Sequence, residues 1–406
     1  MPSDNFVIVG GGLAAAKAAE ALREQQFGGP IVLIGDERHR PYERPPLSKD
    51  LLLGKAEADS VYVHDESWYG EHEVDLRLGT AVTAVDRDAH EVRLDDGSTV
   101  AYRKLLLATG ASPRRLPVPG ADAQGVHHLR KVEDSQRIKE MLGSVSRLVV
   151  IGAGWIGLEV TAAAREANVA VTVVELEELP LLAALGRELA EVFTKLHREH
   201  DVDFRFGQQA TEISVTDGRA SGVVLADGTR MEADAVLVSI GAAPNTDLAA
   251  QAGLTVDNGI VVDAALQSSD PDIVAAGDVA NAFHPVLKRQ IRVEHWQNAI
   301  SQPVVAATTM LGKPASYDEL PYFYTDQYDL GMEYLGDPTG YDRVVFRGDV
   351  DGREFIAFWT KENRVLAGMN VNVWDVGDPI KALILSGKAV DPAALADPDK
   401  ALESLV

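Results

Sequence analysis

Residues 148–175 have the sequence LVVIGAGWIGLEVTAAAREANVAVTVVE, and this stretch decides the fold. A short apolar run rich in β-branched residues, typical of a buried strand, leads into Gly152, Gly154 and Gly157 in G-x-G-x-x-G spacing. An Ala-rich helix and a second strand ending on Glu175 are expected to follow. The first glycine allows a tight turn, the second lets the backbone approach a pyrophosphate, and the third lets the helix pack closely on the strand. The stretch predicts a dinucleotide-binding unit, with a Gly-rich turn of an unrelated α/β protein as the alternative.

Glu175 indicates which dinucleotide this unit binds. A carboxylate at the end of the second strand can accept both hydroxyls of an adenosine ribose, whereas it would repel a 2′-phosphate. The two residues that follow, Leu176 and Glu177, are not basic. The pattern therefore favours NADH over NADPH.

The same pattern occurs a second time, in residues 5–36, NFVIVGGGLAAAKAAEALREQQFGGPIVLIGD. A strand over residues 6–9 leads to Gly10, Gly12 and Ala15 in G-x-G-x-x-A spacing, followed by a helix, a turn and a strand over residues 31–34. Each half of the chain then continues with a hairpin turn at Asp-Gly and an apolar strand that ends in glycine. The order of elements predicts an internal duplication of a whole dinucleotide-binding domain.

Composition limits the function classes. The chain has 406 residues, a net charge of −24 and no cysteine. The charge argues against nucleic acid and against an anionic membrane surface as partners. Without cysteine the chain can hold no disulfide relay, thiolate nucleophile or Cys-ligated iron–sulfur cluster. No run of 18 apolar residues and no signal-peptide pattern is present, so a cytoplasmic protein is expected.

Two polar positions stand out between the expected elements. In residues 38–55, RHRPYERPPLSKDLLLGK, three prolines are expected to hold the chain extended, Ser48 is a candidate helix N-cap, and Lys49 is either a functional cation or a surface lysine. Asp278 follows Gly277 at the end of an expected strand over residues 273–276, before an expected helix. An acid there lies where open α/β sheets bind ligands, and it can also be a helix N-cap.

From about residue 320 the sequence changes character. Alternating aromatic and polar residues with Asp-Gly and Glu-Asn turns predict an antiparallel sheet, followed by a helical segment from Pro379. The C-terminal tail has no basic amphipathic face with bulky apolar residues, so no membrane anchor is expected.

Several motifs together resemble one family. IVGGGLAA, RPPLSK, LLLATGASPR, VVIGAGWIGLEV, IVAAGDVA, VEHWQNA and FYTDQY are similar to those of the pyridine-nucleotide-disulfide-reductase-like flavoproteins. Among these the chain most resembles the oxygenase-coupled, putidaredoxin reductase-like NADH–ferredoxin reductases. The resemblance implies an α/β fold with two Rossmann-like domains of the glutathione-reductase type. Residues 1–112 and 242–320 would bind FAD, residues 113–241 would form an inserted NADH-binding domain, and residues 321–406 would form a C-terminal α+β domain with an antiparallel sheet.

The resemblance also assigns roles to residues. Gly10, Gly12 and Ala14 would lie near the FAD pyrophosphate and Asp36 near the ribose, while Asp278 would bind the ribityl chain. Trp296 would present its backbone to the flavin ring, and Arg130 would lie on the side of the FAD domain. Lys49 would lie beside the flavin N5 and pair with Glu159, which makes these two the catalytic candidates. The remaining expected cofactor-binding residues are Ala15, Val82, Thr109, Gly110, Gly152, Gly154, Ile156, Gly157, Glu175, Gly241, Gly277 and Tyr324.

The implied function is FAD-dependent NADH–ferredoxin reduction. Hydride would pass from NADH to FAD, and electrons would then pass one at a time to a [2Fe–2S] ferredoxin that feeds a haem-thiolate monooxygenase or a Rieske dioxygenase; no metal is needed. An NADH oxidase or quinone reductase of the same fold is one alternative, and a redox-sensing flavoprotein is another. The oligomeric state stays open, with a monomer favoured.

Two features depart from the family pattern. The family often has Trp-Phe-Trp where this chain has Tyr322-Phe323-Tyr324, so an electron-exit role for Tyr324 is in doubt. A reductase with a net charge of −24 also needs a local basic patch to attract an acidic ferredoxin. Lys288, Arg289 and Arg292 are the candidate patch, unless they are scattered solubility charges.

Overall fold

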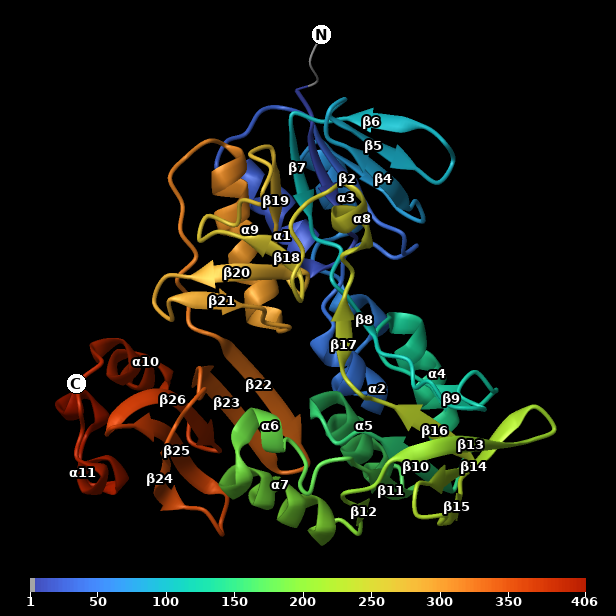
Figure 1. Cartoon of the computed structure of the whole chain (residues 1–406), viewed down its shortest axis with the longest axis vertical. Helices are drawn as coiled ribbons and strands as arrows, with labels where there is room; N and C mark the ends of the chain where they lie inside the picture. Colours follow the sequence, from blue (N-terminus) through green and yellow to red (C-terminus); the bar gives the residue numbers. More distant parts are fainter. Residues whose placement is uncertain (1–3) are drawn as a thin grey trace. The chain divides into compact units, whose positions relative to one another are not determined.

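The computed structural model describes residues 4–406 (Figure 1). The first three residues, which begin the segment where no signal peptide is expected, lie outside the described residues. The chain forms two compact units. The first unit contains residues 4–44, 58–112 and 242–321, and the second contains residues 45–57, 113–241 and 322–406.

The first unit is built on a five-stranded parallel sheet with the order β19-β7-β1-β2-β3. The register places Phe6 beside Ile31 on one side and Lys104 on the other. Most of the strands are short apolar runs because both faces of a parallel sheet are buried, whereas the edge strand over residues 74–77 also contains an aspartate and an arginine. Their bounds are β1 Phe6–Val9, β2 Ile31–Ile34, β3 Val74–Arg77, β7 Lys104–Leu107 and β19 Ile273–Ala275.

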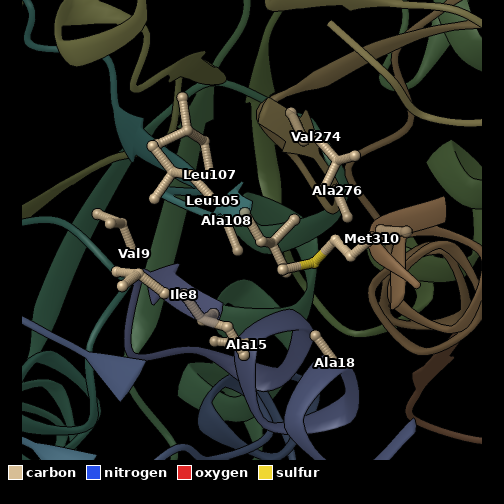
Figure 2. Close-up of a cluster of buried hydrophobic side chains, with 14 of the residues drawn as sticks. Ile8, Val9, Ala15, Ala18, Leu105, Leu107, Ala108, Val274, Ala276 and Met310 are labelled. Carbon is tan, nitrogen blue, oxygen red and sulfur yellow. The ribbon is translucent and has the colours of Figure 1, made fainter. Parts of the chain in front are cut away.

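Helices α1 (Leu13–Glu24) and α9 (Trp296–Met310) pack against each other in this unit. Figure 2 shows how their side chains meet the sheet: Ala15 and Ala18 of α1 and Met310 of α9 lie with Leu105 and Val274 in one apolar cluster. Alanines on α1 let the helix approach the strands closely, which fixes the position of the turn that precedes the helix.

Smaller elements complete the first unit. Two three-stranded sheets have the orders β4-β5-β6 and β18-β20-β21. The bounds are η2 Ala58–Val61, α3 Glu66–Glu71, β4 Val82–Asp86, β5 Glu91–Leu94, β6 Thr99–Ala101, α8 Asp247–Gln251, β18 Ile260–Val262, β20 Ala280–His284 and β21 Arg289–Ile291. Two of the boundaries between the units fall in or beside the short strands β8 (Ala111–Pro113) and β17 (Ala242–Pro244).

The second unit contains another five-stranded parallel sheet, with the order β12-β11-β10-β16-β9, and a three-stranded sheet of β13, β14 and β15. Helix α5 follows β10 directly, as α1 follows β1 in the first unit. The bounds are η1 Pro45–Ser48, α2 Asp50–Leu53, β9 Val126–His127, α4 Val132–Leu142, β10 Arg147–Ile151, α5 Trp155–Glu166, β11 Ala170–Val174, α6 Leu182–Leu185, α7 Arg187–Glu199, β12 Asp203–Arg205, β13 Ala210–Thr216, β14 Arg219–Leu225, β15 Arg230–Glu232 and β16 Ala235–Val238.

The same unit includes a five-stranded antiparallel sheet with the order β22-β23-β26-β25-β24. Its core contains Ile356 and Phe358 of the sheet and Ile380, Leu383 and Leu395 of the helices that follow. Glu362 and Asn363 both have positive φ in the tight turn between β25 and β26. The bounds are β22 Tyr322–Gln327, β23 Leu330–Gly336, β24 Arg343–Asp349, β25 Glu354–Lys361, β26 Arg364–Val371, α10 Gly377–Ser386, α11 Pro392–Ala396 and η3 Leu402–Leu405.

The predicted fold class is confirmed: two parallel sheets in Rossmann-like arrangements accompany a C-terminal antiparallel sheet. The division into three domains stays a prediction. Among residues 4–406, no helix combines the length and the apolar character needed to cross a membrane.

Three local predictions are wrong. Pro45 and Pro46 begin the 3₁₀ helix η1 and are not extended. Ser48 is not an N-cap, since Lys49 holds that position for α2 and the Ser48 hydroxyl donates to Glu159. Asp278 precedes no helix, because strand β20 starts at Ala280 and pairs with both β18 and β21.

Candidate functional site

The first glycine turn leaves free space at the N-terminus of α1. Gly10 has a φ of +130°, and a Cβ there would lie 2.1 Å from the carbonyl oxygen of Ala108. Gly12 is the N-cap of α1, where no side chain caps the helix and the first turn contains no acid. A Cβ on Gly12 would meet only the Arg44 Nη2 atom, at 3.9 Å. Unpaired N–H groups at a helix N-terminus with free space before them fit a pyrophosphate.

The second glycine turn repeats this geometry. Gly152 has a φ of +103° and a Cβ there would lie 2.2 Å from Ser239 O, whereas a Cβ on Gly154 would meet no atom within 4 Å. Gly154 is the N-cap of α5, again without a capping side chain or a first-turn acid. A Cβ on Gly157 would lie 2.3 Å from Gly152 O, so only glycine allows this approach of helix to strand. Gly152 and Gly157 allow the tight turn and the close helix–strand packing that the sequence predicts, whereas the approach of a pyrophosphate to Gly154 stays a prediction.

Glu175 lies directly beside the second turn. It follows the last residue of β11, and its Oε2 accepts a hydrogen bond from Ala153 N at 2.6 Å while its Oε1 accepts from Glu177 N at 3.0 Å. The carboxylate is therefore held at the end of β11 with its charge next to the glycine turn. This position suits recognition of ribose hydroxyls, and the predicted role of Glu175 stays a prediction.

Sequence reasoning missed a polar cluster beside the first turn. Glu37, which is 9% exposed, accepts hydrogen bonds from Tyr42 OH at 2.5 Å and from Arg44 Nη2 at 3.1 Å. The predicted ribose ligand, Asp36, is the exposed neighbour of Glu37. The spacing of Glu37, Tyr42 and Arg44 matches no known motif. The Tyr and the Arg inside a Pro-rich segment were the only features of the sequence that could have indicated this cluster.

Asp278 and Gly277 follow β19 at the carboxyl end of the first sheet. Gly277 N donates to Gln302 Oε1 of α9 at 2.9 Å, and a Cβ on Gly277 would lie 3.1 Å from the Cβ of Ala14. Asp278 also interacts electrostatically with Arg44. The structure thus brings Ala14, Gly277 and Asp278 together with the first glycine turn, and Gln302 and Arg44 join them as residues that the sequence did not predict.

Of the other predicted residues of the first unit, Thr109 lies beside the first glycine turn, with its N atom 3.3 Å from the Cβ position of Gly10. Gly110 has a φ of +67°, and Thr109 exchanges hydrogen bonds with Asn245: Thr109 Oγ1 donates to Asn245 O at 2.7 Å and Asn245 Nδ2 donates to Thr109 O at 2.8 Å. Ala15 is buried in α1, Val82 begins β4, and Trp296 begins α9. These positions do not test cofactor binding, so the cofactor-binding roles of these residues stay predictions.

Lys49 and Glu159 form a buried ion pair in the second unit. Lys49 Nζ lies 2.6 Å from Glu159 Oε1, and the two side chains are 15% and 6% exposed. Thr325 Oγ1 donates to the same carboxylate oxygen at 2.6 Å, and Ser48 Oγ donates to the other. The ring centroid of Tyr324 lies 5.5 Å from Lys49 Nζ, which suits a cation–π contact. The pairing that the resemblance implies is confirmed, whereas its catalytic role stays a prediction.

The remaining predicted residues of the second unit are Arg130, Ile156 and Gly241. Arg130 N donates to Asp134 Oδ2 at 3.0 Å just before α4. Ile156, in the first turn of α5, is 39% exposed, and Gly241 has a φ of +91° and accepts a hydrogen bond from Arg114 N at 2.9 Å. In the described part of the chain no group of three or more His, Cys, Asp or Glu side chains is placed to hold a metal ion.

The predicted basic patch is smaller than expected. Lys288, just before β21, and Arg289, the first residue of β21, are exposed and lie next to the exposed apolar residues Phe283 and Val286. Arg292 is only 11% exposed, donates to Asp278 O at 3.2 Å and pairs with Glu294. Because Arg292 is largely buried and pairs with Glu294, it does not belong to an exposed patch.

Comparison with known proteins finds two matching family models. Residues 4–303 match the family model of the pyridine nucleotide-disulphide oxidoreductases, and residues 322–406 match that of the reductase C-terminal domain. The chain belongs to the pyridine nucleotide-disulphide oxidoreductase family. As a member of it, the protein is an oxidoreductase.

Relatives of this oxidoreductase match it along its length. It is 41% identical to the ferredoxin–NAD(+) reductase component of the anthranilate 1,2-dioxygenase system of Burkholderia cepacia, over 100% of both chains. It is 39% identical to putidaredoxin reductase of Pseudomonas putida, over 100% of this chain and 97% of the relative. The crystal structure of a covalent putidaredoxin reductase–putidaredoxin complex matches with a TM-score of 0.94 and 38% identity, covering 100% of this chain and 98% of that one.

Proposed function

We propose that this oxidoreductase is an FAD-dependent NADH–ferredoxin reductase, which passes electrons from NADH through FAD to a [2Fe–2S] ferredoxin that supplies an oxygenase. The observation that carries the proposal is the pair of glycine turns, each at the uncapped N-terminus of a helix, in a chain whose full-length relatives are named as ferredoxin–NAD(+) reductases. Two dinucleotides need two such turns.

The first turn suits FAD. We propose that the N–H groups at the start of α1 bind its pyrophosphate, with the Arg44 guanidinium beside Gly12 adding positive charge. Asp278 accepts hydroxyl groups of the same ligand. When bound, FAD accepts a hydride from NADH and returns the two electrons singly to a one-electron acceptor.

The second turn suits NADH. We propose that the start of α5 binds the NADH pyrophosphate and that Glu175, already held by Ala153 N, accepts the ribose hydroxyls. The carboxylate would repel a 2′-phosphate at this position, so the preferred nucleotide is NADH.

We propose that Lys49 and Glu159 serve the reduction step. A fixed ammonium in a site of low dielectric constant stabilises the negative charge that the flavin gains. Glu159 accepts from Lys49 at 2.6 Å, which limits the rotation of this largely buried side chain. Tyr324 borders the ammonium with its ring face.

The partner is a protein acceptor of single electrons. Ferredoxins are acidic, and Lys288 and Arg289 offer an exposed positive patch in a chain whose net charge is −24. A cytoplasmic location and a monomeric state are parts of the same proposal.

Comparing acceptors tests the proposal. The FAD-loaded protein is given NADH with a [2Fe–2S] ferredoxin, with a soluble quinone, or with air alone, and NADH consumption is followed. Turnover that is fastest with the ferredoxin is expected. Rapid turnover with the quinone or with oxygen and none with a range of ferredoxins would replace the reductase by a quinone reductase or an oxidase. Slow reduction without turnover in any arm would favour a redox sensor.

A further inference from the structure

A chain of hydrogen bonds extends from Glu159 into the interior of the second unit. Thr325 Oγ1 lies 2.6 Å from Glu159 Oε1, and Gln327 Nε2 lies 3.3 Å from Thr325 Oγ1. Gln327 Oε1 lies 2.8 Å from His197 Nε2, and His197 Nδ1 lies 3.3 Å from Tyr328 OH. The chain links α5 to β22, and β22 to α7.

The carboxylate sets the direction of every donor in this chain. An ionised Glu159 only accepts, so the Thr325 hydroxyl donates to it and receives a hydrogen bond from the Gln327 amide N–H. The Gln327 oxygen then faces His197, which must carry its proton on Nε2. His197 Nδ1 is thereby left to accept from the Tyr328 hydroxyl. All four donors point toward the carboxylate.

Most of these groups are buried away from water. Glu159 is 6% exposed, Thr325 and Gln327 are each 1% exposed, and His197 is fully buried. Hydrogen bonds are stronger in such an interior than in water, and aligned donors polarise one another. Burial, opposed by the hydrogen bond that His197 donates to Gln327, lowers the pKa of His197 to about 4. The imidazole is therefore neutral near neutral pH, as a single proton on Nε2 requires.

We propose that Gln327, His197 and Tyr328 are positioning residues that hold the Thr325 hydroxyl as a donor to Glu159, and so keep this carboxylate oriented toward Lys49. Without Gln327 and His197, the Thr325 hydroxyl could rotate away from Glu159. The carboxylate would then lose one of its three donors and bind Lys49 in a less defined position. The inference rests on the proposed function only where it concerns flavin reduction.

The protonation state of His197 tests the chain directly. ¹⁵N NMR of the FAD-loaded protein labelled at histidine, with His197→Gln to assign the signal, reports which ring nitrogen carries the proton. We expect a neutral ring protonated on Nε2 at neutral pH, and loss of this signature in Gln327→Met, which removes the amide. An imidazolium, or a ring protonated on Nδ1, would overturn the proposed direction. This readout does not depend on turnover.

The functional part is tested at Thr325. Because a hydrogen bond to a charged group is lost, Thr325→Val should slow the limiting rate of flavin reduction by NADH about 10-fold. NADH affinity should stay within about twofold, since the lost bond acts on the reaction step. Thr325→Ser should restore the rate because it restores the hydroxyl.

Thr360 provides the matched control. It is a second buried threonine, 1% exposed on β25 of the same sheet, and its Oγ1 donates to Arg343 O at 3.3 Å. Thr360→Val should reduce flavin at the wild-type rate. Equal rates in Thr325→Val and Thr360→Val would overturn the inference. If Thr325→Val slows flavin reduction but the wild-type protein does not reduce a ferredoxin, only the proposed acceptor is contradicted.

Discussion

The carboxylate of Glu159 has both oxygens engaged, one by Lys49 and Thr325 and the other by Ser48. A buried ion pair of this kind contributes little net stability, because removing two charges from water costs about as much as their attraction returns. Removing one partner leaves the other charge buried and unpaired. Such a cluster is therefore better explained by chemistry than by stability.

Lys49→Ala tests that explanation. Loss of a fixed charge that stabilises a reaction step typically slows the step about 100-fold, and we expect this for flavin reduction by NADH in stopped flow. FAD content should stay at the wild-type level, and Lys49→Arg should retain much of the rate because it retains the charge. An unchanged rate in Lys49→Ala would remove the charge-stabilising role.

Glu175→Arg should shift nucleotide preference. Replacing the carboxylate by a guanidinium removes repulsion of a 2′-phosphate and supplies a partner for it, so the ratio of kcat/KM for NADPH to that for NADH should rise about 10-fold or more, equivalent to about 1.4 kcal/mol. Glu175→Gln removes the negative charge without adding a positive one, so comparing it with Glu175→Arg shows how much of the change in preference comes from each. If the ratio is unchanged in the arginine variant, Glu175 does not lie at the ribose.

At the scale of elements, the two βαβ units were the most predictable part of the chain. Strands β1 and β2 lie where the apolar runs predict them, because a strand buried on both faces is continuous in sequence. Ser48 and Asp278 were misjudged because their surroundings come from distant residues. Ser48 donates to Glu159, 111 positions away, and the strand after Asp278 is paired with β18 and β21.

The glycines of the second turn separate stability from binding. Gly154→Ala points its Cβ into open space at a backbone φ of −80°, so it should fold with a loss below about 1 kcal/mol and still weaken NADH binding about 10-fold. Gly152→Ala meets Ser239 O at 2.2 Å with a φ of +103° and should lose about 1–3 kcal/mol. Thermal unfolding and NADH titration measure both effects. Wild-type NADH affinity in Gly154→Ala would contradict this site.

His197 makes folding sensitive to acid. Its pKa is about 4 in the folded protein because of burial, against 6.5 for an ordinary histidine. Above the higher value the ring is neutral in both states and contributes nothing. As pH falls from that value toward about 4, His197 becomes protonated in the unfolded chain but stays neutral in the folded chain. The free energy of unfolding therefore falls by up to about 1.4 kcal/mol per pH unit. The free energies of unfolding of wild type and His197→Gln can be measured with urea across this pH range. The free energy should depend less steeply on pH in the variant. Identical slopes would show that His197 titrates normally.

At the scale of the whole molecule, the net charge of −24 says how much charge the chain carries but not where the positive residues are exposed. The duplication and the family were visible in the sequence, because glycine spacing and motif order survive in the chain itself. The basic patch was not, since Arg292 turned out to be paired with Glu294.

Reversing the exposed charges tests the docking surface. Lys288→Glu with Arg289→Glu should raise the apparent KM for ferredoxin about 10-fold and flatten its dependence on salt, because attraction becomes repulsion. Reduction of the flavin by NADH should not change. Arg103→Glu with Lys313→Glu alters the same amount of charge at other exposed positions of the first unit and serves as the control. Equal effects of the two double variants would place docking elsewhere.

The most direct test of the reductase assignment is a sequential stopped-flow experiment on the FAD-loaded wild-type protein. It is mixed first with NADH, then with a [2Fe–2S] ferredoxin and cytochrome c. We expect fast bleaching of the flavin by NADH and cytochrome c reduction that requires the ferredoxin. Fast bleaching followed by no ferredoxin-dependent step, across several [2Fe–2S] ferredoxins, would contradict it.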